Sequence, residues 1–579
     1  MPEPSVVVPV PLPEDAPKLF YRRGNRWPRA IAWFGFKSFW GHLWHLAASV
    51  IATEDIDSRD WMHPATARAL TRRLADTIGA ARPDADSLAE ALDGDVWIDF
   101  VSDTGDDFSV SKAVARLIAS EYEVDDPDDP TKKLVLPRGD VLLFGGDTAY
   151  PVATEVEIHN RVCVPFNTVL RTVADDKKRA LLGVPGNHDW YAGLDGFGRM
   201  FRARRLMLGR AEKEDDLSVD RFGQIGHFVE WVEAFRLGTN VVKRAALALT
   251  GYTPVQDASY WTFRVAPNLD LWGADRQLRL VDFHQRAFFA EERDPDRGIV
   301  LCVADPPYAF LEPSRAGQEI LAALDLGIEK DGLLVLTGDT HHYCRQTMGP
   351  GMQVLAGGGG AFLHPATINR RGLPEPDAEF PGRTTTVVLA LQVPWQIAHG
   401  RSGFVVHTVL ALVQAPIFMH QWRTHEGAGL LSVVVALAAF LVCFFLGGFR
   451  KNRLKVAALS LVCGSVIGLL PLVVFEVLLW FHIARALTFL ALGLAGTVYV
   501  GTLALGAYLM LLTMLGIEQH QAFSALAHPG YKHFVRLRFK KDGSHADGWV
   551  FGRVDPLKKD DPVVLVDRFR WKNPKCAAR

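Results

Sequence analysis

The sequence predicts an α/β protein of layered sheets and helices, followed by an α-helical transmembrane domain and a small β-containing tail. Short apolar runs bounded by glycine alternate with helical stretches between residues 96 and 190, which is typical of layered α/β architecture. Residues 404–517 hold long apolar segments with almost no charge. After residue 518, short strand-like runs are joined by a glycine turn.

The N-terminal region contains two segments of unusual composition. Residues 1–28 are rich in proline and are predicted to be extended or disordered. They lack a basic start followed by an apolar core, so no secretory signal is predicted. Residues 29–55 mix tryptophan and phenylalanine with cationic side chains, which favours a helix at the membrane interface or one packed against the membrane domain. Residues 56–400 are expected to form the main domain, beginning with a charged helical lead-in.

Overall composition excludes some classes of partner. The chain has 579 residues and a formal net charge of -2, so no global positive charge predicts binding of nucleic acid. Its six cysteines are scattered, without the spacing of a disulfide framework or a zinc knuckle. A reducing compartment is therefore expected.

Polar side chains follow three apolar runs within residues 96–190. Each run has the length and glycine boundary of a strand buried on both faces. Asp103 follows the first run, Asp147 the second, and Asn187 and His188 the third. Because the carboxyl ends of such strands share one edge of a sheet, these four side chains are expected to meet in one crevice.

The same residues have the chemistry of metal ligands. Tyr150 lies three residues after Asp147, and a later run, LLVLTGDTHHY, supplies Asp339, His341 and His342. A single Gly-Asp after a strand is usually a turn, and that reading stays open for each segment alone. Four segments that each deliver ligand-type side chains favour a metal site.

SDTG, GDTAY and GNHD occur in this order and resemble the first three signature motifs of the calcineurin-like metallophosphoesterases. Their spelling is most similar to the purple acid phosphatase branch, and the resemblance covers residues 95–365. It implies a metallophosphoesterase-type β-sandwich flanked by helices, with two metal ions about one bridging aspartate. It also implies that the first metal is held by Asp103, Asp147, Tyr150 and His341, and that the second shares Asp147 and adds Asn187. Segments near residues 357–365 and 520–539 resemble a membrane-associated subgroup of this superfamily.

Two later motifs depart from the family pattern. Where the family has His followed by Pro, this chain has ADPP, so Asp305 is the candidate ligand and Ala304 marks the change. Where the family has GHxH, the chain has GDTH, which puts Asp339 in place of a histidine. Carboxylates in these places favour Mn²⁺ or Mg²⁺ over Zn²⁺ at the second site, within a divalent or mixed-valence pair drawn from Mn, Mg, Fe or Zn. The alternative is a site that has lost one metal and has become a binding module.

Four apolar segments form the predicted membrane domain over residues 404–517. Residues 429–449, 456–481 and 487–517 are long and nearly free of charge, so each is expected to span a bilayer. Residues 404–422 are interrupted by His407, Gln414 and Pro416, which leaves three or four spans open. The basic loop RKNRLK is expected to be cytoplasmic. With four spans, the main domain and the C-terminal β unit, 518–579, then also face the cytoplasm.

These features together predict a membrane-anchored, metal-dependent phosphoester hydrolase, either a phosphatase or a phosphodiesterase. Two metals would polarise the phosphoryl group and activate a water, while His188, oriented by Asp189, would donate a proton. The expected partners are membrane lipids and a phosphoester such as a lipid headgroup or a nucleotide. A catalytically degenerate binding or sensor module is one alternative. A transporter with a regulatory soluble domain is another, although the spans carry almost no charge for a solute pathway.

Overall fold

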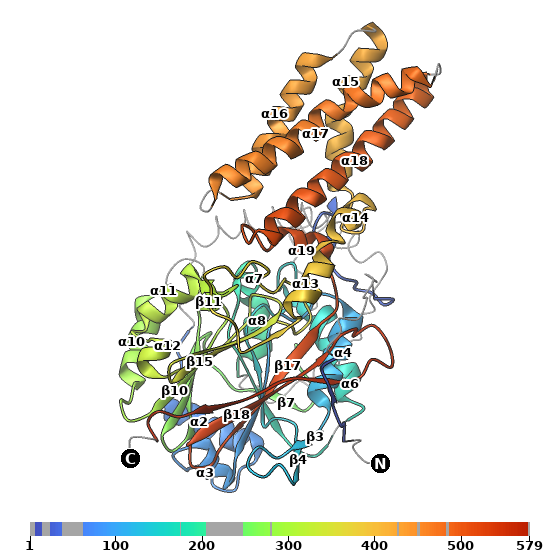
Figure 1. Cartoon of the computed structure of the whole chain (residues 1–579). Coiled ribbons are helices and arrows are strands. Elements are labelled where there is room, and N and C mark those ends of the chain that lie inside the picture. Colours follow the sequence, from blue (N-terminus) through green and yellow to red (C-terminus); the bar gives the residue numbers. More distant parts are fainter. Residues whose placement is uncertain are drawn as a thin grey trace, which may run out of the picture.

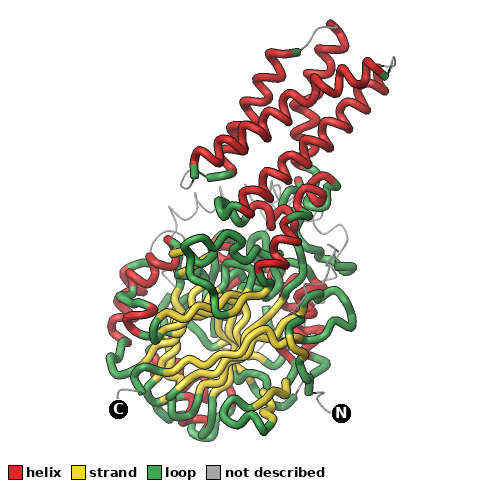
Figure 2. The backbone as a smooth tube through the Cα atoms, viewed as in Figure 1, coloured by secondary structure: helices red, strands yellow, loops and turns green. Residues whose placement is uncertain are grey.

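Two large β-sheets stacked face to face form the core of the soluble part (Figures 1 and 2). The computed structural model describes residues 6–13, 24–36, 62–173, 175–203, 247–277, 281–424, 428–448, 452–481 and 486–576. The eight-stranded sheet has the order β1 (Val10–Pro11), β19 (Val564–Lys572), β18 (His545–Arg553), β17 (Lys532–Phe539), β2 (Val96–Val101), β5 (Val141–Phe144), β6 (Arg179–Gly183) and β7 (Tyr252–Pro254). The seven-stranded sheet has the order β16 (Ala378–Phe380), β14 (Tyr343–Met348), β15 (Gly351–Ala356), β13 (Leu334–Thr337), β10 (Gly298–Val303), β9 (Leu269–Ala274) and β8 (Trp261–Ala266).

Alternation of side chains along the strands builds two cores. Ile98 and Phe100 of β2 belong to the same core cluster as Val300 and Leu334 of the other sheet, so these faces pack against each other. The opposite faces contribute to a second cluster that includes buried residues of the outer helices. These helices are α4 (Phe108–Ala119), α6 (Val164–Leu170), α10 (Phe283–Glu292) and α11 (Arg315–Ala323). The result is a sandwich covered by helices, in which central strands such as β5, β6, β10 and β13 are buried on both faces.

The C-terminal strands belong to the main sheet. We expected 518–579 to be a small β unit packed on the main domain; its strand β17 in fact joins the main sheet and pairs antiparallel with β2 over residues 535–539 and 96–100. Arg536 Nε lies 2.7 Å from Asp99 Oδ1, and both side chains are fully buried. Arg536 also donates to the carbonyl oxygens of Ile118, Ser120 and Leu136. A buried guanidinium needs such partners. Strand β2 therefore gains its antiparallel neighbour only from β17, near the C-terminal end of the sequence.

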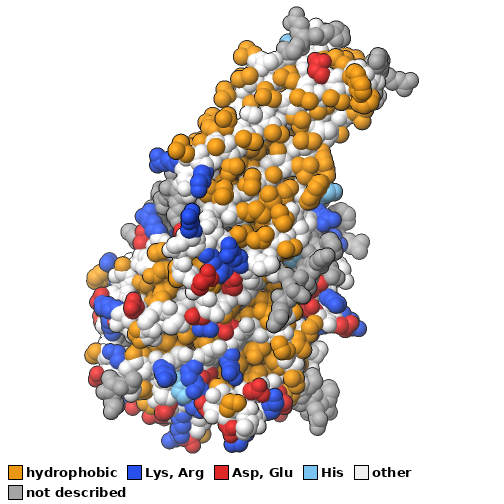
Figure 3. Space-filling model, viewed as in Figure 1, with side chains coloured by type: hydrophobic (Ala, Val, Ile, Leu, Met, Phe, Trp, Pro, Cys, Tyr) orange, Lys and Arg blue, Asp and Glu red, His pale blue; other side chains and the backbone are white. Residues whose placement is uncertain are grey.

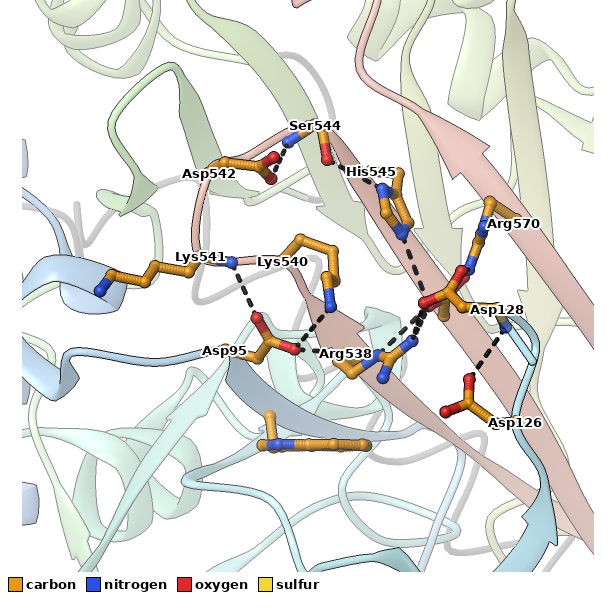
Figure 4. Close-up of polar contacts among 12 residues, drawn as sticks. Asp95, Asp126, Asp128, Arg538, Lys540, Lys541, Asp542, Ser544, His545 and Arg570 are labelled. Carbon is orange, nitrogen blue, oxygen red and sulfur yellow. Dashed lines mark hydrogen bonds and ion pairs between the residues drawn. The ribbon is translucent and has the colours of Figure 1, made fainter. Parts of the chain in front are cut away.

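A polar network fixes the outer end of the β17–β18 hairpin (Figure 4). Arg538 of β17 lies 2.5 Å from Asp547 of β18, and Arg570 of β19 lies 2.6 Å from the same carboxylate. Arg570 also pairs at 2.6 Å with Asp128, in the loop between β3 (Tyr122–Asp125) and β4 (Lys133–Leu136). Because a slip of one residue would separate these charges, the network favours the observed register.

The N-terminal segment 24–36 crosses the main domain as irregular backbone. The N–H groups of Ala30 and Ile31 donate to Asp107 and Asp106, at 3.0 and 2.8 Å. The N–H group of Phe34 donates to the carbonyl oxygen of Ser402. The helix expected over 29–55 is not formed by residues 29–35, because the N–H groups of Ala30, Ile31 and Phe34 bind partners far along the chain. Residues 37–55 lie outside the described part.

Four long helices extend away from the sandwich (Figure 1). They are α15 (Val405–Thr424), α16 (Gly429–Leu446), α17 (Arg453–Trp480) and α18 (Ala486–Met514). Within the described residues, α16, α17 and residues 490–514 of α18 are long and apolar enough to cross a membrane. Their outward side chains are apolar, as the space-filling view shows (Figure 3). Such a large exposed apolar surface indicates contact with lipid, so the protein is membrane-associated.

The helix α15 differs from its three neighbours. It is not among the helices that meet the length and hydropathy of a span, and it contains His407, Gln414 and Pro416. Its Gln414 side chain is buried and donates to the carbonyl oxygen of Ile467 in α17 at 3.0 Å. This bond satisfies a polar group between two helices, which is how helices associate in a bilayer.

Candidate metal centre

The site is built where strands end and the backbone turns sharply. Asp103 and Asp339 follow β2 and β13 by two residues, and Asp147 follows β5 by three; their φ values are 58°, 61° and 47°. Left-handed backbone at a residue other than glycine costs on the order of 1–3 kcal/mol and is concentrated at functional sites. Three aspartates in this conformation at one edge of the sandwich therefore mark a site.

The Tyr150 hydroxyl is the point on which the first set of residues converges. It lies 2.9 Å from Asp103 Oδ1, 3.3 Å from Asp147 Oδ2 and 3.0 Å from His341 Nε2. His341 Nε2 is in turn 3.4 Å from Asp103 Oδ1. The structure thus brings together the four residues predicted for the first metal, although they come from three separate strand ends.

The donor set at Tyr150 suits a cation. His341 Nδ1 lies 2.8 Å from the carbonyl oxygen of Phe362, which can only accept, so Nδ1 carries the proton and neutral Nε2 presents a lone pair. Two carboxylates and this lone pair then share a single hydroxyl proton. Among the described residues, no group of three or more His, Cys, Asp and Glu side chains is arranged to hold a metal. A metal here would therefore depend on Tyr150 to join Asp147 to the Asp103–His341 pair.

The His188 side chain lies beside this set. Its backbone N–H donates to Asp147 Oδ1 at 2.8 Å, and its Nδ1 donates to the carbonyl oxygen of Pro151 at 2.6 Å. The imidazole is half-buried and packs against Tyr150, with ring centroids 4.4 Å apart. The Nδ1 contact with Pro151 and the packing on Tyr150 fix the orientation of the imidazole.

Asp189 has a different place from the one predicted. We expected it to orient His188, but the Pro151 carbonyl accepts from that imidazole. Asp189 Oδ2 instead accepts from the backbone N–H groups of Gly186 and Thr148, at 2.9 and 3.2 Å. Burial raises the pKa of Asp189 to about 6. Asp189 is therefore a residue that holds the Asp147 and Asn187 loops together.

The residues predicted for the second metal are arranged differently. Asn187 Nδ2 donates to the Tyr191 hydroxyl at 3.0 Å, which leaves the amide oxygen as the acceptor. Asp305 Oδ1 lies 2.9 Å from Arg276 Nη1. The half-buried Asp339 presents its backbone N–H to Asp103 Oδ2 at 2.9 Å. Because Asp305 already has a cationic partner, this half of the site does not fit a second metal as the first half does.

Negative charge accumulates across both halves. Burial, followed by the charges of Asp103, Asp189 and Asp339, raises the pKa of Asp147 well above its usual value. Burial and then the charge of Asp339 raise the pKa of Asp305 to about 7, while Arg276 opposes the increase. Burial and the charge of Asp103 also raise the pKa of Asp339. Carboxylates held this close favour protonation or a bound cation.

A run of four glycines, residues 357–360, packs tightly beneath the site. The N–H groups of Gly359 and Ala361 donate to the carbonyl oxygens of Ser102 and Asp103, both at 2.9 Å. A Cβ atom at Gly357 would lie 2.5 Å from the Thr340 carbonyl oxygen and 2.9 Å from Asp103 Oδ2. The run is therefore a close-packed loop under the site, and these two N–H groups are engaged with backbone.

Several residues of the site were missed in the sequence. Trp33 packs edge-on against Tyr150, His188 and Phe362, with centroids 5.6–6.4 Å apart, and nothing in its sequence context indicates this contact. Arg276 follows β9 by two residues, so the rule that identified Asp103 would have identified it. His364 stacks on His341 at 4.1 Å, and His520 lies 5.0 Å from His364.

Comparisons with known proteins give no family. No family model matches the chain, and no curated protein matches it. Among solved structures, it is similar to GAP50, the anchor in the inner membrane complex of Plasmodium, at 9% identity and a TM-score of 0.27 over 47% of this chain and 74% of that one. It is also similar to PhoD, at 12% identity and a TM-score of 0.24 over 46% of this chain and 58% of that one. Similarity at these TM-scores carries no argument about function, so the function is argued from the residues.

Proposed function

We propose that the protein is a membrane-anchored, metal-dependent phosphoester hydrolase. The observation that carries the proposal is the convergence of Asp103, Asp147 and His341 on the Tyr150 hydroxyl, all within 3.3 Å. The order and spelling of the sequence motifs that contain these residues support it. A divalent metal at this place supplies Lewis-acid activation of the phosphoester and of the attacking water.

The chain's own residues have separate roles in this proposal. Asp103, Asp147, Tyr150 and His341 bind the metal, and the Phe362 carbonyl fixes the tautomer of His341. His188 Nε2 moves a proton to or from the substrate, because Nδ1 is held by Pro151. Asp189 keeps the two loops in place.

We propose that both ends of the membrane domain lie on one side of the bilayer. Strand β17, which follows the membrane helices, pairs with β2, which precedes them, and this pairing supports the proposal. We therefore infer an even number of crossings, with α15 as the fourth span beside the three apolar helices. The N-terminal end of α17, which begins at Arg453 and carries Lys455, is the end of this helix nearer the sandwich (Figure 1), and positive charge near the end of a span favours the cytoplasm. Both the main domain and the C-terminus are thus assigned to the cytoplasmic side.

Metal content and hydrolysis measured on one preparation test the function. Asp147→Asn is expected to lose metal and activity together on a phosphoester panel with Mn²⁺, Mg²⁺, Zn²⁺ and Fe. His188→Ala is expected to keep its metal while kcat falls by roughly 10²–10⁴, the usual effect of a positioned acid or base. Asp325→Asn, whose side chain is 83% exposed, is the control. A wild-type protein without bound metal, or an Asp147→Asn variant that hydrolyses normally, would refute the proposal.

A binding or sensor module remains the second candidate. The pairing of Asp305 with Arg276 favours it, because a predicted ligand is engaged by a side chain of the protein. Wild-type protein that binds metal and phosphate but hydrolyses no member of the panel would select this candidate.

A further inference from the structure

Arg276 occupies the half of the site predicted for the second metal. It lies two residues beyond the end of β9, on the sheet that also carries Asp305 and Asp339. Arg276 Nη1 is 2.9 Å from Asp305 Oδ1. The Asp305 side chain is 10% exposed and that of Arg276 is 34% exposed, so the carboxylate is enclosed while the guanidinium remains accessible.

The charge of Arg276 reaches the other groups of this half. It lowers the pKa of Asp305, of Asp339 and of Tyr191, which is the hydrogen-bond partner of Asn187. These neighbours are the groups around which a second divalent cation was expected. A fixed positive charge among them reduces the repulsion that such an ion would otherwise offset.

Within the described part of the chain, the Arg276 guanidinium donates to one side chain only, that of Asp305. It has five N–H donors, and one lies on Asp305. The Arg276 side chain is 34% exposed, so it is not closed in by packing. It also lines a cavity of about 170 Å³ with Val281, Arg286, Ala316, Glu319 and Ile320, none of which belongs to the candidate metal centre. Guanidinium groups bind phosphoryl oxygens through paired N–H donors, which an ammonium group cannot reproduce.

We propose that Arg276 replaces a second metal ion, so that the chain holds one metal, at Asp103, Asp147, Tyr150 and His341, and binds the phosphoryl oxygens of its ligand through this arginine. The inference rests on the proposed function for the identity of the ligand. It differs from the two-metal expectation raised by the sequence, because the structure commits Asp305 to an ion pair.

Metal stoichiometry and affinity for inorganic phosphate test this inference without hydrolysis. In full-length protein in detergent, saturating Mn²⁺ is expected to give one metal per chain. Arg276→Met is expected to weaken phosphate binding about 10- to 100-fold, the usual effect of charge-assisted hydrogen bonds. It is also expected to admit a second, weaker Mn²⁺, because Asp305 and Asp339 lose their cation. Arg286→Met, in the same cavity, is the matched control and should leave both quantities unchanged.

Arg276→Lys keeps the inference testable if the methionine variant does not fold. It keeps the positive charge but removes the paired N–H donors of the guanidinium. It is expected to retain one metal per chain and to lose most of the phosphate affinity. Two metals in the wild-type protein would overturn the inference and leave the proposed function standing, whereas no metal at all would overturn both. Unchanged phosphate affinity in folded Arg276→Met or Arg276→Lys would also overturn the inference.

Discussion

Asp339→Gly is expected to stabilise the metal-free protein while abolishing its activity. Asp339 has a φ of 61°, and glycine adopts such backbone without strain. Relief of left-handed strain contributes about 1–3 kcal/mol, from which the greater freedom of glycine in the unfolded chain subtracts about 0.4–1 kcal/mol. The substitution also removes a carboxylate that the neighbouring charge of Asp103 disfavours. The two backbone effects leave a net gain in unfolding free energy of about 0–2.6 kcal/mol, to which the relief of charge repulsion adds.

Thermal unfolding of the full chain in detergent with a chelator measures this gain, because chelation removes stabilisation by bound metal. A gain of 1 kcal/mol raises the melting temperature of a domain this large by about 1–2 °C. Asp325→Gly is the control, since Asp325 has a φ of 51° but an exposed side chain paired with Arg293 and Lys330. Asp325→Gly keeps the relief of left-handed backbone strain, but it removes no buried carboxylate. If Asp339→Gly melts below the wild type, or retains full activity with Mn²⁺, strain and charge at Asp339 do not serve the site.

Three further variants or fusions test other parts of the structure. Arg536→Met, which leaves Asp99 buried without its partner, is expected to cost about 3–5 kcal/mol of stability, seen as faster proteolysis; Arg536→Met combined with Asp99→Leu should recover most of it. Reporter fusions at the N-terminus and after Arg579 should lie on the same side of the membrane, with a fusion in the loop after α15 on the opposite side; opposite N- and C-terminal signals would remove α15 as a span. Trp33→Ala should leave metal content unchanged and lower kcat up to about tenfold, which corresponds to the free energy of aromatic packing on His188. An unchanged rate would mean that Trp33 does not position this imidazole.

The sequence predicted the parts of the site that depend on local structure. A buried strand that ends at glycine places the next polar side chain at the sheet edge, and this rule alone brings Asp103, Asp147 and Tyr150 together. It could not predict that Pro151 rather than Asp189 orients His188, because that choice depends on how two loops pack. Arg276 follows its strand by two residues, as Asp103 does, but it was missed because arginine is not a metal ligand and because its partner Asp305 is 29 residues away.

The fold shows the same limit over longer distances. The membrane helices were recognised from apolar length, which is a local property. The position of the C-terminal tail was not recognised, because β17 pairs with a strand more than four hundred residues earlier. Arg536 and Asp99 are 437 positions apart in the sequence. Strand periodicity predicts that a strand exists, but it does not identify the neighbour.

The insertion of the membrane helices within one sandwich fixes the site relative to the bilayer. Helix α18 ends at Met514. The loop after it is hydrogen-bonded to the segment that follows glycines 357–360, because Asn369 Nδ2 donates to the Leu515 carbonyl oxygen at 2.9 Å. The same loop carries the exposed His520, whose ring lies 4.9 Å from that of Phe310 and 5.0 Å from that of His364. The His364 ring stacks on His341, a residue of the first metal set. An unbroken series of contacts therefore links the end of a membrane helix to the candidate metal centre, so the site is held close to the membrane surface. If the proposed phosphoester hydrolysis is correct, we expect this geometry to act on a phosphoester presented at that surface.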